Sequence, residues 1–140
     1  MRALSAFLGI LWNNSYGMSV DRRTTNTSVL VVDDEPAIRK VVATALAQMG
    51  CDETYLAEDA ESALEIIERQ RPSLVISDVK LPAMSGVELA HRVKSSQDLN
   101  GTPILLISAF GEPEGHAADG FLAKPFDIAD LAEFVEPYLS

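Results

Sequence analysis

The chain has 140 residues, of which 47% are hydrophobic and 23% are charged, as is typical of a single folded domain with one core. Its formal net charge of −10 argues against nucleic acid as a partner, because the phosphates would repel this surface.

Residues 1–27 differ in composition from the rest of the chain. The apolar stretch over positions 1–12 is shorter than the about 20 residues that a membrane-spanning helix needs, so we expect no membrane partner. An arginine near the start and small residues at 15 and 17 also resemble a secretory signal, which stays an alternative. The polar run that follows favours a flexible N-terminal extension, with Met18 as an alternative start of the chain.

The next part of the chain alternates strand and helix patterns. A β-branched run at 29–32 predicts a strand buried on both faces. Apolar residues at helical spacing then predict a helix over 36–49, which Gly50 would end as a C-terminal cap. A weaker strand at 54–56 follows, and Asp59 would cap the helix after it.

The second half of the chain repeats this alternation. The apolar run at 74–77 predicts a third strand, which leads directly into Asp78. A helix over 86–94 follows, and the run at 104–107 predicts a fourth buried strand that ends at Ser108. A carboxylate at the end of a buried strand is unfavourable unless a cation or hydrogen bonds offset it, so Asp78 calls for an explanation.

A fifth strand is predicted at 121–123, and a last helix over 128–135 has Asp127 as its cap. The stretch between the fourth and fifth strands carries Gly111, Pro113 and Gly115, which are unfavourable in a helix interior. We therefore expect a loop, or at most one helical turn, in this crossover. Short strands alternating with amphipathic helices predict a doubly wound α/β domain with a five-stranded parallel sheet.

In such a sheet, ligands bind beyond the carboxyl ends of the strands. The side chains at these ends are acidic, hydroxyl and ammonium groups, namely Asp33, Asp34, Glu35, Asp78, Ser108 and Lys124. Crowded carboxylates favour a hard divalent cation, and a site with oxygen ligands favours Mg²⁺. Asp78 would then be the nucleophile in a phosphoryl transfer, with Lys124 and Ser108 holding the phosphoryl oxygens.

Four motifs carry a resemblance to a known family: VVDDE after the first strand, DVKLPAMSG after the third, ISA after the fourth and FLAKPF at the fifth. In this order the chain from 28 to 140 resembles the receiver domain of response regulators in two-component systems. The resemblance implies a CheY-like, flavodoxin-like sheet with strand order 2-1-3-4-5. It also implies a cis linkage between Lys124 and the proline that follows it.

The resemblance further implies roles for single residues. Asp78 would be the phosphoacceptor, supplied by a histidine kinase or a histidine phosphotransfer protein. Mg²⁺ would be bound by Asp34, Asp78 and the Lys80 backbone carbonyl, with Asp33 helping through water. Ser108 and Phe121 would be the two switch residues.

Two positions next to these, Phe110 and Lys80, lie in receivers near the path of the water that attacks the acyl phosphate. A bulky ring at Phe110 would shield the phosphoryl group.

On this basis we expect a stand-alone, cytoplasmic receiver that signals through protein contacts or a phosphorelay and is not a turnover enzyme. Its downstream target is not evident from the sequence. A degenerate receiver that binds a partner without phosphorylation is the alternative. A hydrolase with an aspartate nucleophile is disfavoured, because its usual second aspartate is replaced by Lys80.

Single residues also have simpler interpretations. Asp33 or Asp34 alone would cap the first helix equally well. Phe121 also fits as an ordinary core residue. The two histidines, His91 and His116, lack partners in the sequence pattern and are predicted to lie on the surface.

Overall fold

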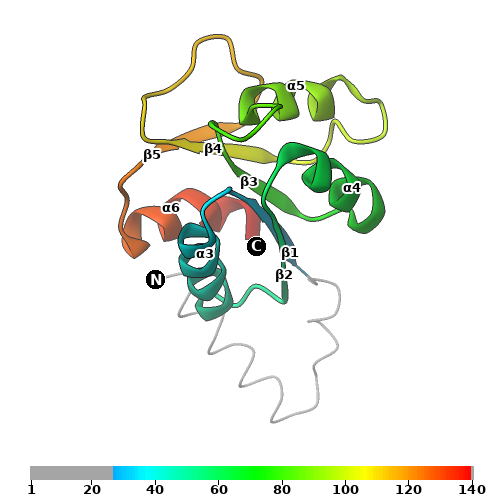
Figure 1. Ribbon diagram of the computed structural model, residues 1–140. Coiled ribbons are helices and arrows are strands. Elements are labelled where there is room, and N and C mark those ends of the chain that lie inside the picture. Colours follow the sequence, from blue (N-terminus) through cyan, green and yellow to red (C-terminus); the bar gives the residue numbers. More distant parts are fainter. Residues whose placement is uncertain (1–26, 140) are drawn as a thin grey trace, which may run out of the picture.

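The computed structural model describes residues 27–139 (Figure 1). The predictions made for positions 1–26, including the flexible extension and the alternative start at Met18, lie outside the described residues. Within residues 27–139, no helix combines the length and the apolar character that crossing a bilayer requires.

The centre of the molecule is a parallel sheet of five strands in the order β2-β1-β3-β4-β5 (Figure 1). The strands are β1 (Ser28–Val32), β2 (Glu53–Ala57), β3 (Leu74–Asp78), β4 (Ile104–Ser108) and β5 (Gly120–Ala123). The two central strands β3 and β4 are buried along their whole length, which agrees with their continuous apolar sequences. The predicted fold class and strand order are therefore confirmed.

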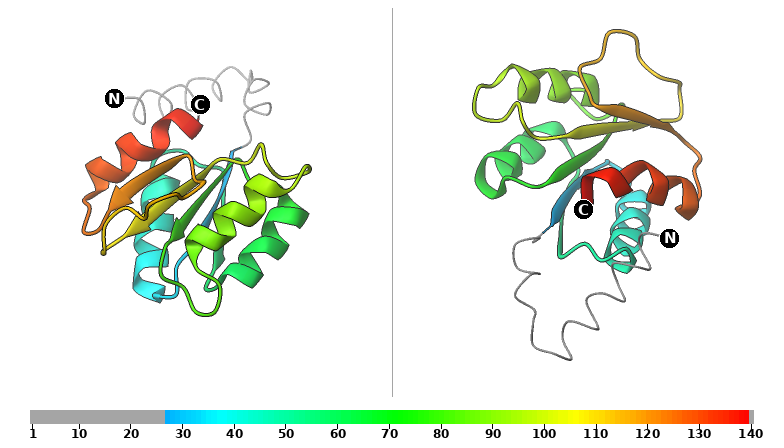
Figure 2. Two further views of the ribbon diagram at one scale, coloured as in Figure 1. Left: turned by 90° about the horizontal axis from the view of Figure 1, so that it is seen from above. Right: turned by 180° about the vertical axis from the view of Figure 1, so that it is seen from behind.

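Helices cover both faces of the sheet (Figure 2). They are α3 (Pro36–Gln48), α4 (Ala60–Gln70), α5 (Gly86–Ser95) and α6 (Ile128–Leu139). Alternate side chains of each strand enter opposite cores: Leu30 and Val32 pack under α4 and α5, whereas Val29 and Val31 pack under α3 and α6.

The helix ends follow the predicted capping chemistry. The Asp59 carboxylate accepts the Ser62 N–H at 2.8 Å, and the Asp127 carboxylate accepts the Asp130 N–H at 2.8 Å. Gly50 follows α3 with φ of +96°, the left-handed conformation that glycine adopts without strain.

Two apolar residues of these helices are exposed. Val41 is 49% exposed because it lies on the flank of the α3 stripe, whose centre is formed by Val42 and Leu46. Ile128 is 48% exposed as the first residue of α6, before the turn where Leu131 enters the core. The pattern of the last helix predicted that Ile128 is buried, and that prediction is wrong.

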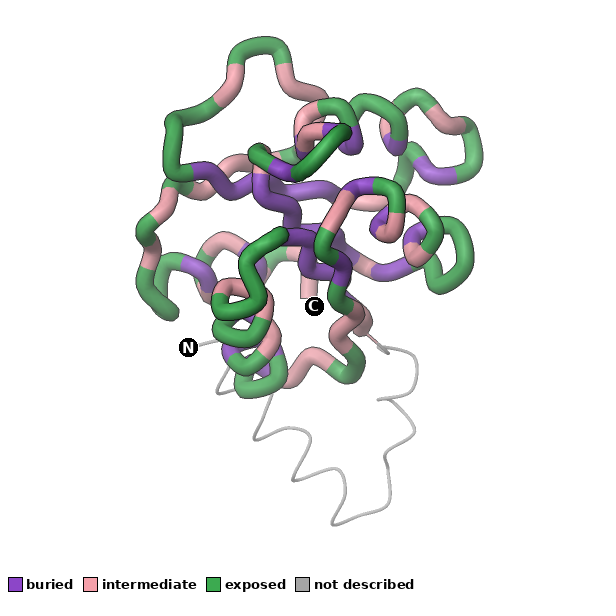
Figure 3. Tube along the Cα trace, viewed as in Figure 1, coloured by how far each residue is buried: buried purple, intermediate pink, exposed green. Residues whose placement is uncertain are grey.

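The chain between β4 and β5 forms a loop, as predicted from its glycines and proline, and much of it is exposed (Figure 3). Its far end is held by Asp119, whose carboxylate accepts the Ile104 N–H at 2.8 Å and pairs with the Lys94 ammonium at 2.9 Å. Lys94 also donates to the Thr102 carbonyl at 2.8 Å. These contacts fix the start of β5 in register although no helix packs between the two strands.

His116, in this loop, is less exposed than the sequence predicted. The side chain of His116 is only 11% exposed, and its Nε2 lies 2.8 Å from a Glu112 carboxylate oxygen. Its Nδ1 accepts the N–H of Ala118 at 3.1 Å. The prediction of a surface position is confirmed for His91, which is exposed, whereas His116 is only partly exposed and its side chain is largely covered.

Candidate functional site

The first acidic residue of the site, Asp33, is fully buried just after β1. Its Oδ2 accepts the Lys124 ammonium at 3.1 Å and its Oδ1 accepts the Glu35 N–H at 2.9 Å. A buried carboxylate needs such partners, because its hydration has been lost. Glu35 is the N-cap residue of α3, and no side chain caps this helix. The alternative that Asp33 or Asp34 merely caps it is therefore wrong.

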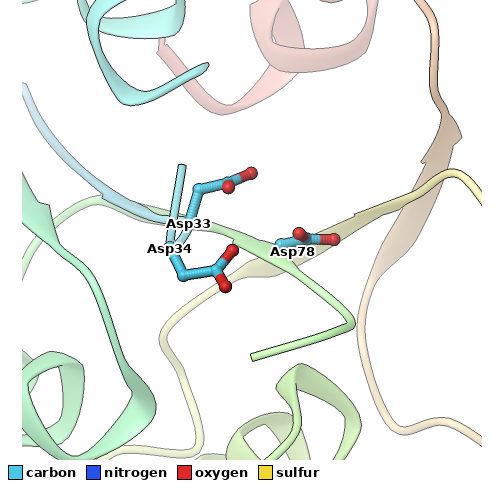
Figure 4. A group of neighbouring side chains, drawn as sticks. All are labelled: Asp33, Asp34 and Asp78. Carbon is cyan, nitrogen blue, oxygen red and sulfur yellow. The ribbon is translucent and has the colours of Figure 1, made fainter. Parts of the chain in front are cut away.

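Asp78 is the last residue of β3 and is 7% exposed. Its Oδ2 accepts the Lys124 ammonium at 3.3 Å, and its Oδ1 accepts the Lys80 N–H at 3.4 Å. Figure 4 shows the side chains of Asp33, Asp34 and Asp78 as neighbours, with those of Asp33 and Asp34 extending to the side on which Asp78 lies. Each of these three residues offers one oxygen, and the three oxygens lie within 4.8 Å of one another.

Lys124 follows β5 and reaches into this acidic group, which we call the acidic pocket (Asp33, Asp34, Asp78). Its ammonium contacts two of the three carboxylates, and the exposed Glu35 carboxylate lies 3.7 Å away. Its backbone N–H donates to the Ser108 carbonyl at 2.9 Å, which joins the ends of β4 and β5. The Lys124–Pro125 peptide is cis, as the family resemblance implied.

The two residues expected to switch lie on β4 and β5. Ser108 is buried at the end of β4, beside Ala123, and its Oγ accepts the Phe110 N–H at 2.9 Å. Phe121 is half-buried and packs, like Ala118, against the core under α4 and α5. The structure thus brings the predicted hydroxyl to the same sheet edge as Asp78, and it places the half-buried Phe121 ring on the strand next to that of Ser108.

Burial and neighbouring charge shift the pKa values of the two central groups. Burial raises the pKa of the Asp78 carboxyl, the nearby Asp33 carboxylate raises it further, and the attraction of Lys124 only partly offsets both. Burial by itself lowers the pKa of the Lys124 ammonium, but the contacts with Asp33 and Asp78 outweigh it and raise that pKa. The pocket thus keeps its lysine charged and makes ionised Asp78 unfavourable without a further cation.

This leads to a prediction for stability without Mg²⁺. The folded protein holds a proton on Asp78 more tightly than the unfolded chain does. The contribution of Asp78 to the free energy of unfolding therefore falls as pH rises from about 3.9, the ordinary pKa of an aspartate, through the raised pKa of the folded protein. Asp78→Asn should therefore gain stability relative to the wild type as pH rises over that window. Urea unfolding of both proteins at several pH values measures this difference, and a difference that does not change with pH would contradict it.

Two contacts of the acidic pocket were not predicted from the sequence. Glu35 was placed at the sheet edge but not beside the Lys124 ammonium. Arg39, in the first turn of α3, donates from Nη1 to the Asp33 carbonyl oxygen at 2.6 Å. Helical spacing gives only the face on which an arginine lies, so it carried no signal for this contact.

The comparison with protein families identifies the family of this chain. Residues 29–136 match the model of the response regulator receiver domain. The chain belongs to the response regulator receiver family. Receiver domains are signalling domains of two-component systems and bind Mg²⁺ in an acidic pocket, and this chain has a cluster of three aspartates.

Several characterised proteins are similar to this receiver. The probable transcriptional regulatory protein TcrX of Mycobacterium tuberculosis is 39% identical over 110 residues, which are 74% of this chain and 46% of TcrX. The chain thus spans about half the length of such regulators. Sporulation initiation phosphotransferase F of Bacillus subtilis is 32% identical, with 81% of this chain and 94% of that protein covered. The structure of the chemotaxis response regulator CheY4 of Vibrio cholerae matches with a TM-score of 0.75 and 33% identity, covering 82% of this chain and all of CheY4.

Proposed function

We propose that this receiver, over residues 28–140, accepts a phosphoryl group on Asp78 from a histidine kinase or a histidine phosphotransfer protein. The observation that supports this most strongly is the joint position of Asp78, two further aspartates and Lys124 at one sheet edge. A carboxylate that is buried, close to others and contacted by a lysine suits an acceptor whose new negative charge must be held at once.

Mg²⁺ fits this pocket because all its side-chain donors are carboxylate oxygens, the ligands that hard cations prefer. We assign Asp34, Asp78 and the Lys80 carbonyl as ligands, with Asp33 acting through water. Bound Mg²⁺ would neutralise charge on the phosphoryl oxygens and on the carboxylates.

In the proposed transfer, a carboxylate oxygen of Asp78 forms a bond to phosphorus while the phosphorus–nitrogen bond of the donor phosphohistidine breaks. The donor imidazole leaves and takes up a proton, and the product is an acyl phosphate. Lys124, which contacts Asp78 already, would pair with a phosphoryl oxygen. The pair of Lys124 with Asp33 keeps the ammonium at this place throughout.

The switch would involve Ser108 and Phe121. The Ser108 hydroxyl, which already accepts the Phe110 N–H, can donate its own proton to a phosphoryl oxygen. Phe121 would then follow inward against the core. Movement of the Ser108 end of β4 would also reach the exposed loop that follows it.

The role proposed for the protein is cytoplasmic signalling or phosphorelay by protein contacts, without enzymatic turnover. The alternative is a receiver that binds its partner without being phosphorylated. Incubation with acetyl phosphate, with and without Mg²⁺, distinguishes the two. We expect an intact-mass increase of about 80 Da that needs Mg²⁺ and is absent in Asp78→Asn. An unmodified wild type would favour the alternative.

The lifetime of the phosphorylated form gives a further prediction. The Phe110 ring is 78% exposed, and the Lys80 ammonium lies 5.1 Å from its centroid. This pair joins the loops that follow β3 and β4, the strands that end at Asp78 and Ser108. We expect Phe110→Ala to speed loss of the phosphoryl group by roughly two- to tenfold, corresponding to about 0.4–1.4 kcal/mol in the barrier.

The loss is followed by intact mass after the phosphodonor has been removed. The control is Ile128→Ala, which removes an exposed apolar side chain at the start of α6. Phe126→Ala is less suitable, because that ring is partly buried against the core. Equal rates for Phe110→Ala and the wild type would contradict the shielding role.

A further inference from the structure

All four polar groups of Asp33 are engaged in fixed contacts. Its N–H donates to the Ala57 carbonyl at 3.1 Å, and its two carboxylate oxygens accept from Glu35 and Lys124. Its carbonyl oxygen accepts from the Arg39 guanidinium at 2.6 Å. Asp33 is therefore anchored on every side.

Asp34 differs from its neighbour in this respect. It is exposed, and its carboxylate accepts no hydrogen bond from the residues that the structure describes. One of its oxygens still lies within 4.8 Å of oxygens of Asp33 and Asp78 (Figure 4). Like charges at this separation repel, so the Asp34 side chain gains by turning toward solvent unless its backbone keeps it in place.

The peptide between Asp33 and Asp34 sets the direction of the Asp34 side chain. Among residues 27–139, Arg39 is the one side chain that donates to this peptide. The backbone of Arg39 is fixed, because its backbone N–H donates to the Glu35 carbonyl at 3.2 Å in the first turn of α3. The guanidinium thus ties the helix start to the peptide that carries Asp34.

We propose that Arg39 is a positioning residue for the metal site: its hydrogen bond to the Asp33 carbonyl keeps the Asp34 carboxylate beside Asp33 and Asp78, where Mg²⁺ binds. The inference rests on the proposed function, because it assumes that the acidic pocket takes Mg²⁺. The hydrogen bond from Arg39 would raise the affinity for Mg²⁺, whereas its positive charge alone would lower it.

The sign of the effect separates this role from simpler ones. Removing a positive charge next to three carboxylates should strengthen Mg²⁺ binding if charge alone matters. A residue that only stabilises α3 should leave the affinity unchanged. The positioning role instead predicts weaker binding when the hydrogen bond is lost, by about tenfold, as is typical of groups that orient metal ligands.

The test is a titration with MgCl₂ at constant ionic strength, followed by backbone amide NMR shifts, on the wild type, Arg39→Met, Arg39→Lys and Lys40→Met. Lys40 is the matched control, because it is an exposed cation on the same helix whose ammonium has no hydrogen bond or ion pair in the described structure. Arg39→Met should bind Mg²⁺ about tenfold more weakly, and Arg39→Lys, which keeps a charged donor, should recover to within about threefold of the wild type. Lys40→Met should bind as the wild type does, or slightly more tightly.

A kinetic measurement gives a second readout. For Arg39→Met, the Mg²⁺ concentration at half-maximal phosphorylation by acetyl phosphate should rise by the same factor as the dissociation constant. The rate at saturating Mg²⁺ should change by less than about twofold, because only metal binding is impaired.

Three results would overturn the inference. Equal or tighter Mg²⁺ binding by Arg39→Met contradicts positioning while leaving the proposed function intact. Equal weakening in Lys40→Met shows that the loss of affinity does not depend on the hydrogen bond from Arg39 to the Asp33 carbonyl. A wild type that does not bind Mg²⁺ overturns both this inference and the proposed function, so the two failures are distinguishable.

Discussion

Replacing Gly86 by alanine is expected to destabilise the protein by about 3 kcal/mol or more and to slow phosphorylation of Asp78. A Cβ atom at this position would lie 2.1 Å from the Asp78 carbonyl oxygen and 3.0 Å from the Ser77 hydroxyl oxygen. Both neighbours belong to the buried strand β3, and the carbonyl is backbone, so neither can yield easily. The Gly86 N–H also donates to the Val79 carbonyl at 2.8 Å, which ties the start of α5 to the end of β3.

The matched control is Gly101→Ala. A Cβ at that position meets nothing within 4 Å, so its effect should stay within about 0.5 kcal/mol. Urea unfolding gives the stabilities, and acetyl phosphate with intact mass gives the phosphorylation rates. If Gly86→Ala were as stable as Gly101→Ala, the close packing of α5 on the phosphoacceptor strand would be wrong.

The second large effect is expected for Lys124→Met. The ammonium is the only cationic side chain of the described structure within ion-pair distance of the Asp33 carboxylate, which is fully buried. Breaking a buried pair by removing one partner leaves an uncompensated charge, with a cost of about 3–5 kcal/mol. We expect a loss near the lower end of that range, because Asp78 and Lys124 keep some contact with solvent.

The control for Lys124→Met is a second substitution that removes the buried Asp33 carboxylate. Adding Asp33→Asn to Lys124→Met removes the unpaired carboxylate and should restore roughly half of the lost stability. Urea unfolding of the two single variants and the double variant, all without Mg²⁺, gives the coupling energy between the two side chains. Additive effects of the two substitutions would show that the pair does not stabilise the fold.

Much of the fold could be predicted because its signals are local. The runs over 29–32, 74–77 and 104–107 are apolar throughout, which only strands buried on both faces tolerate. The crossover that replaces a helix was evident from Gly111 and Pro113, whose backbone preferences act wherever they occur. The joint position of the acidic residues then followed from one rule, that the ends of parallel strands meet at the same edge.

The remaining features depend on contacts across the fold. The burial of His116 is set by Glu112 and by the Ala118 N–H within one irregular loop, for which periodicity gives no information. Val41 is exposed because it lies beside the buried stripe of α3, and the apolar spacing alone does not show which side of the stripe faces the sheet. The Arg39 contact depends on a single side-chain rotamer. Sequence patterns specify faces and edges, whereas such pairings appear only in the folded structure.

The most direct measurement of the central claim is to locate the phosphoryl group on the chain. Borohydride reduces an acyl phosphate to an alcohol and so would convert phosphorylated Asp78 into homoserine. After treatment with acetyl phosphate and Mg²⁺, peptide mass spectrometry should find homoserine at position 78 and at no other aspartate. Modification confined to another residue, or no modification of a protein that binds Mg²⁺, would contradict the assignment of Asp78 as the phosphoacceptor.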